Sequence, residues 1–238
     1  MKTVAQVMKA LKKLGAEQTV KTFARHGAPA NMYGVKVSDL KGIVKQIKGD
    51  QALACELYET GNSDAMYLAG LVADGALMTK KQLDAWVKGA SWYMLAEYTV
   101  AWVAAESPHG RDMAIKWMKS RNESIASSGW ATYSSIVSTR PDEELDLGEI
   151  KELLKRVVAQ IHDSQNRVRM VMNAFVIAVG GYVKPLHKQA KSAAKKIGKV
   201  NVDVDVGDTS CKVPLATEYI EKIEARGTVG KKRKTFKC

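Results

Sequence analysis

The stretch from Ser38 to Gly61 reads SDLKGIVKQIKGDQALACELYETG and carries two helix signals in direct succession. Ser38 begins the first helix, which we expect to stop at Gly49, because serine caps the free N–H groups of a first turn and glycine favours the end of a helix. Asp50 begins the second helix, which stops at Gly61 in the same way. The stretch therefore predicts two helices joined by a short turn, and neither could bury its apolar stripe alone.

Similar helix signals repeat along the chain, with hardly any strand pattern before residue 200. Further pairs begin near residues 63, 91, 122 and 164, so the spacing drifts from 25 to 42 residues and the repeat is one of structure rather than of sequence. Helix pairs in series that need their neighbours to form a core are typical of a stacked α-solenoid of the HEAT kind. We therefore predict an all-α fold in which residues 1–199 form a HEAT-like α-solenoid of stacked antiparallel helix pairs, with a globular helical bundle as the alternative. The helices are expected over residues 4–14, 17–26, 38–49, 50–60, 63–77, 79–89, 91–106, 108–120, 122–139, 148–161, 165–180 and 185–197.

Residues 200–238 form a C-terminal extension of different character. Valine and aspartate alternate from Val200 to Val206 with the period of a strand, so we expect a short extended segment over residues 200–209. A calcium loop does not fit, because counting from Asp203 places Gly207 fifth rather than sixth and leaves no glutamate at position twelve. A helix over residues 214–226 and a basic tail over residues 230–238 complete the extension.

The composition is that of a globular protein. Hydrophobic residues make up 46% of the chain and charged residues 26%, which allows a large core. No apolar run approaches the ~20 residues of a membrane span, and the first residues lack the apolar stretch of a secretion signal, so we expect a cytoplasmic protein without a membrane partner. The three cysteines and four histidines are scattered and lack metal-ligand spacing. The sequence thus predicts no metal and no cofactor, and we expect a monomer.

Positive charge is concentrated in the last third of the chain. Residues 151–238 hold 19 Lys and Arg against 8 Asp and Glu, a net charge of +11, whereas residues 1–150 hold 18 against 17, a net charge of +1. Such a surface attracts polyanions, because counterion release drives the binding of lysine and arginine to phosphates. The sequence therefore favours nucleic acid as the partner, with a merely solubilising surface as the alternative.

The basic residues of this last third fall into three groups. Five lysines on or just before the helix from Pro185 share one stripe at about 100° per residue, two arginines lie on the preceding helix, and four cations lie in the tail. We expect these residues to contact DNA phosphates, although the tail by itself could equally be a solvated terminus. They are Lys184, Lys188, Lys191, Lys195 and Lys199 in the stripe, Arg167 and Arg169 before it, and Lys231, Lys232, Arg233 and Lys234 in the tail.

The segment from Ser91 to Glu97 reads SWYMLAE and is the one that could carry chemistry. On a helix, Tyr93 and Glu97 lie one turn apart, so an aromatic ring would stand beside a carboxylate with Trp92 flanking both. Residues of these types on a helix more often serve packing or face solvent, so the residues alone leave a structural role open.

The arrangement resembles the signature helix Ser-Trp-Trp-Asp-x-Val-Asp of the HEAT-repeat alkylpurine DNA glycosylases, the AlkD family. Ser91 and Trp92 match it directly, Tyr93 stands in the place of the second tryptophan, and Glu97 stands in that of the catalytic aspartate. A second similarity to the family lies upstream, in Ala24-Arg25 and Gly34-Val35-Lys36-Val37-Ser38-Asp39-Leu40. The resemblance covers much of the first 200 residues.

Three positions depart from the family pattern. Met94 replaces an aspartate, Ser127 falls where the family has an arginine in its catalytic cleft, and the later cleft tryptophan falls near Ala174 or Phe175.

The resemblance implies a DNA alkylation repair protein that hydrolyses the N-glycosidic bond of cationic alkylpurines, such as 3-methyladenine and 7-methylguanine, in damaged double-stranded DNA. In that case Glu97 would stabilise the oxocarbenium-like sugar and orient a water, while Trp92, Tyr93 and Phe175 would contact the substrate. The alternative is a non-catalytic HEAT-repeat protein that recognises bent, damaged or branched DNA by its shape. A HEAT-like adaptor for protein partners is the third interpretation.

Overall fold

Helices make up the regular structure of this protein. In the computed structural model, which describes residues 1–203 and 213–237, no residue of these ranges lies in a β-strand and no helix is long and apolar enough to cross a membrane. A π-helix, η2 (Met94–Val100), runs directly into α7, and short 3-10 turns join several other helices. The α-helices are α1 (Val4–Leu14), α2 (Glu17–Arg25), α3 (Val37–Ile47), α4 (Gln51–Glu59), α5 (Ser63–Val72), α6 (Lys80–Gly89), α7 (Ala101–Glu106), α8 (Gly110–Trp117), α9 (Glu123–Thr139), α10 (Leu147–Gln160), α11 (Asn166–Tyr182), α12 (His187–Ile197) and α13 (Ala216–Ala225).

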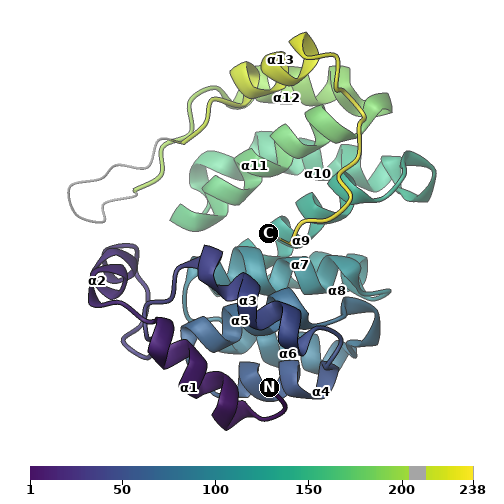
Figure 1. Cartoon of the computed structure of the whole chain (residues 1–238). Helices are drawn as coiled ribbons and strands as arrows, with labels where there is room; N and C mark the ends of the chain where they lie inside the picture. Colours follow the sequence, from purple (N-terminus) through teal and green to yellow (C-terminus); the bar gives the residue numbers. More distant parts are fainter. Residues whose placement is uncertain (204–212, 238) are drawn as a thin grey trace.

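The helices are stacked in two layers along the molecule (Figure 1). Successive helices of the inner layer touch one another in the order α3, α5, η2 with α7, α9, α11 and α13. The helices α6, α8, α10 and α12 alternate with them along the chain and form the outer layer, in which α6 touches α8 and α10 touches α12. From the second predicted pair onward, the first helix is thus an inner helix and the second an outer one, and the predicted α-solenoid is confirmed.

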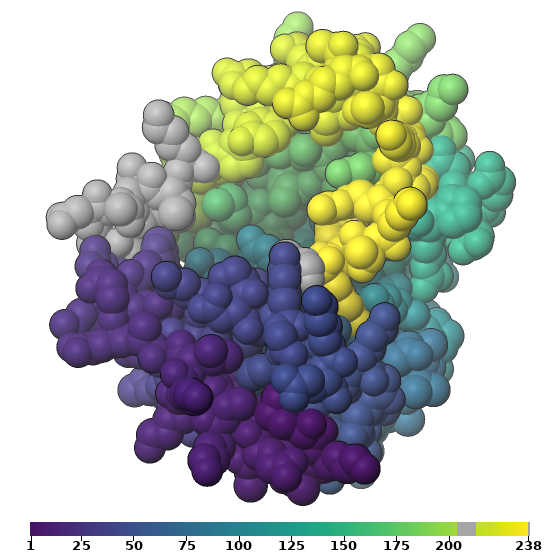
Figure 2. Space-filling model, viewed as in Figure 1, coloured from purple at the N-terminus to yellow at the C-terminus, as the bar shows by residue number. Residues whose placement is uncertain are grey.

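One face of the solenoid is hollowed. Figure 2 shows residues of α11 recessed between the C-terminal segment above and the N-terminal helices below, while the end of the chain crosses one side of the hollow. Inner-layer helices therefore form the back of this hollow, and a curved face of this kind suits an extended partner.

Four of the predicted helix starts are confirmed by capping hydrogen bonds. Backbone N–H groups in the first turns of α1, α4, α6 and α9 donate to the side chains of Thr3, Asp50, Thr79 and Asn122. The prediction for Ser38 is wrong: α3 already begins at Val37, and the Ser38 hydroxyl donates to Asp39 instead. The continuous α-helix predicted over residues 91–106 is also wrong, since its first half is the π-helix η2.

The C-terminal extension packs back onto the solenoid. The predicted helix is confirmed as α13, which lies on α11 and α12. A Cβ at Gly180 of α11 would lie 2.6 Å from Ile220 Cδ1, so the glycine permits the close approach of α13. The extended segment expected over residues 200–209 lies mostly outside the described residues, and its described part, residues 200–203, is neither helix nor strand.

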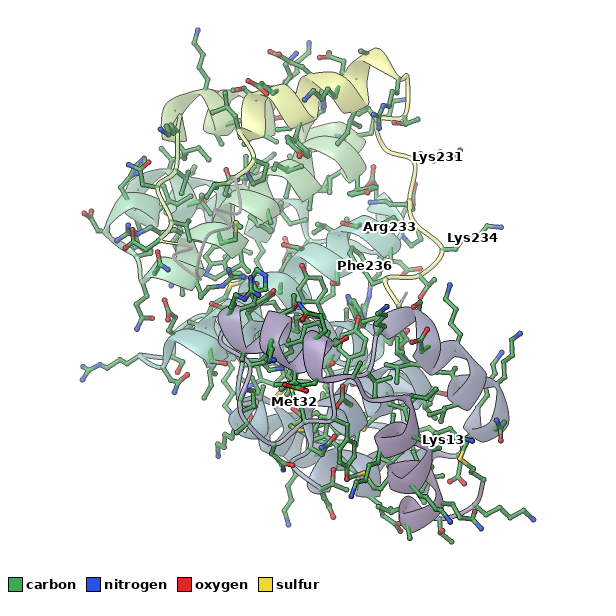
Figure 3. All side chains as sticks on the ribbon, turned by 60° about the vertical axis from the view of Figure 1, so that its left-hand side comes forward. Lys13, Met32, Lys231, Arg233, Lys234 and Phe236 are labelled. Carbon is green, nitrogen blue, oxygen red and sulfur yellow. The ribbon has the colours of Figure 1, made fainter. Side chains whose placement is uncertain are left out.

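Residues 228–237, which we call the strap, run from α13 across the molecule (Figures 1 and 3). Their backbone N–H groups donate to the carbonyl oxygens of Gly181 in α11 and Ser138 in α9, at 2.8 Å each, and the Lys237 ammonium lies 2.7 Å from Glu106 in α7. The strap therefore ties three inner helices together near their C-terminal ends. The alternative of a merely solvated tail is wrong for these residues.

The buried side chains form two clusters that meet where α8 packs on α9. One cluster extends from Val7 to Trp117 and the other from Ala114 to Ile220. At Gly129 of α9, a Cβ would lie 2.6 Å from the backbone nitrogen of Met118. A backbone atom cannot move aside as a flexible side chain can, so Gly129 sets the distance between the two helices.

Replacing Gly129 by alanine should lower the free energy of unfolding by roughly 3 kcal/mol, because α9 would have to move away from α8. Gly42 in α3 gives the matched control, since no atom lies within 4 Å of a Cβ built there. Gly42→Ala should raise the free energy of unfolding by about 0.5–1 kcal/mol, because alanine is the better helix former. Urea denaturation measures both values, and equal effects at the two positions would contradict the close helix contact.

Candidate functional site

The π-helix η2 arranges the side chains of the segment that the sequence singled out. In a π-helix the backbone bonds run from residue i to residue i+5, so side chains five positions apart share a face. Tyr93, at the start of η2, and Tyr98 accordingly lie side by side, with ring centroids 6.4 Å apart. Short π-helical turns are frequent at functional sites.

Glu97 is held by an arginine from the other half of the chain. Arg167 Nε lies 2.9 Å from Glu97 Oε1 and Arg167 Nη2 lies 2.5 Å from Glu97 Oε2, so the guanidinium holds both carboxylate oxygens. The Glu97 side chain is 7% exposed and that of Arg167 is 25% exposed. A second carboxylate fixes the arginine, since the backbone N–H of Arg167 donates to Glu123 at 2.7 Å. The predicted catalytic residue is therefore buried and fully paired.

Burial and the pairing with Arg167 shift the pKa of the Glu97 carboxyl in opposite directions. Burial raises the pKa of the Glu97 carboxyl above its ordinary value, against the hydrogen bond and charge of Arg167, and nearby Glu123 adds to the rise. Burial would lower the pKa of the Arg167 guanidinium, but its hydrogen bond and attraction to Glu97 raise that pKa overall. Glu97 thus depends on Arg167 for its charged form.

The pair borders a cavity of about 200 Å³ between η2, α9 and α11. Within the described residues, the hydroxyl oxygen of Ser127 is buried in this region without a hydrogen-bond partner, as is Trp92 Nε1. Ser127 stands where the family pattern has an arginine, and Arg167 supplies a guanidinium to the same cavity from α11. The lining consists of Ser91, Trp92, Tyr93, Ala96, Glu97, Glu123, Ser124, Ser127 and Arg167.

The aromatic residues expected at the substrate have different surroundings. Trp92 is 8% exposed and packs between Phe23 and Tyr93, at centroid distances of 5.6 and 5.3 Å. Tyr93 is half-buried, and the Arg167 guanidinium lies 4.5 Å from its ring centroid. The structure thus brings Trp92, Tyr93 and Glu97 together as the sequence indicated.

Phe175 is not part of this site. Its side chain is fully buried, and its ring makes edge contacts with Trp130 and Tyr133 at centroid distances of 5.3 and 5.9 Å. The expected substrate contact is wrong, because α11 is packed between α9 and α13 and this face of it belongs to the core.

Four of the residues expected at phosphates already have partners within the protein. Arg167 holds Glu97, and Arg169 donates to the carbonyl oxygens of Ser164 and Asn201. Lys191 lies 2.6 Å from Glu224, and Lys232 lies 2.7 Å from Asp142. Their first role is to hold helices and the strap in place. The remaining expected phosphate ligands are exposed, namely Lys184, Lys188, Lys195, Lys199, Lys231, Arg233 and Lys234.

The N-terminal helices carry a second basic region. It did not show in the net charge of residues 1–150, because acidic residues later in that range cancel it. Residues 1–50 hold 10 Lys and Arg against 3 Asp and Glu, a net charge of +7, whereas residues 51–150 hold 8 against 14, a net charge of −6. Counting charge in shorter windows would have revealed it. Both ends of the solenoid are therefore basic, with an acidic middle between them.

Replacing Arg167 by methionine should destabilise the protein by roughly 3–5 kcal/mol at pH 8, because the buried Glu97 would lose its partner. Without the arginine, the pKa of Glu97 in the folded state would rise further above that of the unfolded chain. Between the pKa of Glu97 in the unfolded chain and its higher pKa in the folded state, folded Glu97 keeps its proton whereas unfolded Glu97 has released it. The stability of Arg167→Met should therefore fall as the pH rises above the unfolded-state pKa, and should be largely restored at pH 5.

The double variant Glu97→Gln/Arg167→Met is the control, since it removes both charges. It should regain most of the stability at pH 8 and lose the pH dependence. Urea unfolding at the two pH values measures both variants, and equal stability of the single and double variants at pH 8 would contradict the buried pair.

Known proteins resemble this chain over almost its full length. Residues 7–196 match the family described as "DNA alkylation repair enzyme". The proteins Lin0241 of Listeria innocua serovar 6a and Lmo0209 of Listeria monocytogenes serovar 1/2a, both described as uncharacterized, are 35% and 34% identical to it over 232 residues, which cover 95% of this chain and 99% of each relative.

A solved structure is 38% identical and superposes with a TM-score of 0.91, over 99% of this chain and 100% of its own. It is described as representing a new family of proteins related to the HEAT-like repeat DNA glycosylases with affinity for branched DNA structures. Together with the stacked helix layers and the cavity beside Glu97, these matches show that the chain belongs to the DNA alkylation repair enzyme family and has its HEAT-like repeat fold.

Proposed function

We propose that this protein binds branched DNA by its shape and does not excise alkylated bases. The observation that carries the proposal is the Glu97–Arg167 pair, in which a guanidinium holds both oxygens of the carboxylate that the family resemblance assigns to catalysis.

Base excision would require this carboxylate to face the deoxyribose. Stabilising a developing positive charge needs an open negative charge aimed at it, and orienting a water needs a lone pair that is not already in use. Glu97 offers no open negative charge, because its side chain is 7% exposed and Arg167 neutralises its charge. Each of its oxygens also already accepts one hydrogen bond from the guanidinium. Opening the site would leave two charges without partners in a buried region, at a cost of several kcal/mol.

The charge distribution supports DNA binding without chemistry. Net charges of +7 over residues 1–50 and +11 over residues 151–238 flank the acidic middle of the solenoid. A branched DNA presents three or more arms that diverge from one point, so each basic end could contact the phosphates of a different arm. The solved relative with affinity for branched DNA, which shares 38% of its residues with this chain, supports the same assignment.

Alkylpurine excision in damaged duplex DNA is the second candidate. It is favoured by the cavity of about 200 Å³ in which Trp92 and Tyr93 stand beside Glu97. This function would require Arg167 to leave the carboxylate when DNA binds.

A four-way DNA junction should bind at least about tenfold more tightly than a linear duplex of the same length and base composition at 0.15 M salt, because only the junction reaches both basic ends. Fluorescence anisotropy with labelled DNA measures both affinities. Equal affinity for the two DNAs would contradict recognition of the branch.

Charge-matched variants control for non-specific attraction. Lys188→Gln/Lys195→Gln removes two exposed lysines of α12 and should weaken junction binding and lower the salt slope by about two. Lys81→Gln/Lys88→Gln removes two exposed lysines of α6, within the acidic middle, and should leave junction binding nearly unchanged.

Wild type and Glu97→Gln should release equally little free base from methylated duplex DNA, at the uncatalysed rate, because the carboxylate is already engaged by Arg167. Chromatography of released 3-methyladenine and 7-methylguanine measures the rates. Release that is fast in wild type and lost in Glu97→Gln would establish the second candidate instead.

A further inference from the structure

A row of aromatic rings extends from the Glu97 cavity along η2 and α7. Phe23 packs on Trp92 at a centroid distance of 5.6 Å, and Trp92 packs on Tyr93 at 5.3 Å. The row continues from Tyr93 to Tyr98 at 6.4 Å and from Tyr98 to Trp102 at 5.6 Å. The π-helix is the reason for its continuity, since a regular α-helix would turn residues five apart to different faces.

Tyr98 is the member of the row that reaches the surface. It is 41% exposed, whereas Trp102 is 3% exposed. Tyr93 and Trp102 both contact the Tyr98 ring edge to face, at interplanar angles of 62° and 85°, so the orientation of the exposed ring is fixed from two sides. Arg167 lies over the neighbouring Tyr93 and keeps a cation beside the row.

The other end of the row meets the strap. A cavity of about 360 Å³ is bordered by Trp102, by Arg140 at the end of α9, and by Lys234 and Phe236 of the strap. The Arg233 guanidinium lies 4.6 Å from the centroid of the Phe236 ring. Figure 3 shows these strap residues following one another along the edge of the molecule, with Lys234 directed outward. Cations therefore lie beside the row of rings at two places, at Tyr93 and where Trp102 meets the strap, and we call the rings with these cations the aromatic path.

We propose that unpaired nucleotides at a DNA branch point bind this path, with a base stacked on Tyr98 and the adjoining phosphates at Arg233 and Lys234. The proposal rests on the proposed function and specifies its ligand, a branch that contains single-stranded nucleotides. Rings beside cations are the means by which proteins hold single strands without regard to sequence, since every base has a face that can stack. A fully paired arm keeps its base faces covered by neighbouring pairs, so Tyr98 distinguishes the two kinds of branch.

The test compares two four-way junctions, one fully paired and one with four unpaired thymidines at the branch point. Wild type should bind the second junction about tenfold more tightly, the gain of a single base stacked on an aromatic ring. Tyr98→Ala should reduce the affinity for the second junction to that for the first and leave the first unchanged. Tyr98→Phe keeps the ring and should keep the tenfold preference.

Tyr219→Ala is the matched control. Tyr219 is 47% exposed on α13 and has a lysine beside its ring, but it lies outside the row, so its removal should not change the ratio of the two affinities. Thermal unfolding of each variant checks that the fold is intact, which we expect because neither tyrosine belongs to the buried core.

The proposed binding of unpaired nucleotides would be overturned if wild type bound the two junctions with equal affinity. It would also be overturned if Tyr98→Ala lost the same affinity for both junctions. Neither result would affect the preference for a paired junction over a linear duplex, on which the proposed function stands. Conversely, a Tyr98-dependent preference for unpaired thymidines in a protein that binds paired junction and linear duplex equally would support the path and refute the proposed function.

Discussion

Two charged side chains from opposite halves of the chain meet below the surface, and the site is arranged around them. Glu97 belongs to η2 and Arg167 to the first turn of α11, 70 positions later in the sequence. Removing both charges from water costs several kcal/mol for each, and only a well-aligned pair of hydrogen bonds recovers that cost. The start of α11 therefore has little freedom relative to η2. The same contact places the guanidinium on Tyr93 and engages both oxygens of the carboxylate.

This constraint separates the scaffold of the family from its chemistry. The stacked helices, the cavity and the aromatic residues are all present, and the acidic group joins η2 to α11 through Arg167. Binding by shape needs none of that reactivity, because phosphate contacts and the geometry of the DNA provide the affinity. In the function that we propose, the basic ends of the solenoid and the rings along η2 contact the DNA, and the strap adds cations where the row of rings ends.

Local signals in the sequence predicted the helices well, because capping residues and glycines act within one turn. The helices expected from residues 4, 50, 79 and 122 all begin there to within one residue, each with a side-chain cap. The stacking of helix pairs was predicted from the order of the helix signals, and Trp92, Tyr93 and Glu97 were correctly grouped because they are neighbours in sequence.

Features that depend on tertiary packing could not be predicted from these local sequence signals. The π-helix was missed, because a sequence shows spacing but not which backbone bonds form. Arg167 was assigned to phosphates on its charge alone, whereas its partner was set by the stacking of α11 on α9 and of α9 on η2. Phe175 was assigned to the substrate, although α11 is covered on this side and the ring packs against Trp130. The strap was taken for a basic tail, since nothing in its composition tells that its backbone bonds to Gly181 and Ser138.

A crystal structure of the protein bound to a four-way junction would test the central claim most directly, through the contacts of Arg167. If the protein recognises branches without chemistry, both oxygens of Glu97 will still accept hydrogen bonds from Arg167 in the complex. An arginine that has moved to a phosphate, with Glu97 facing the C1′ of a deoxyribose, would contradict the account and restore Glu97 as a catalytic carboxylate.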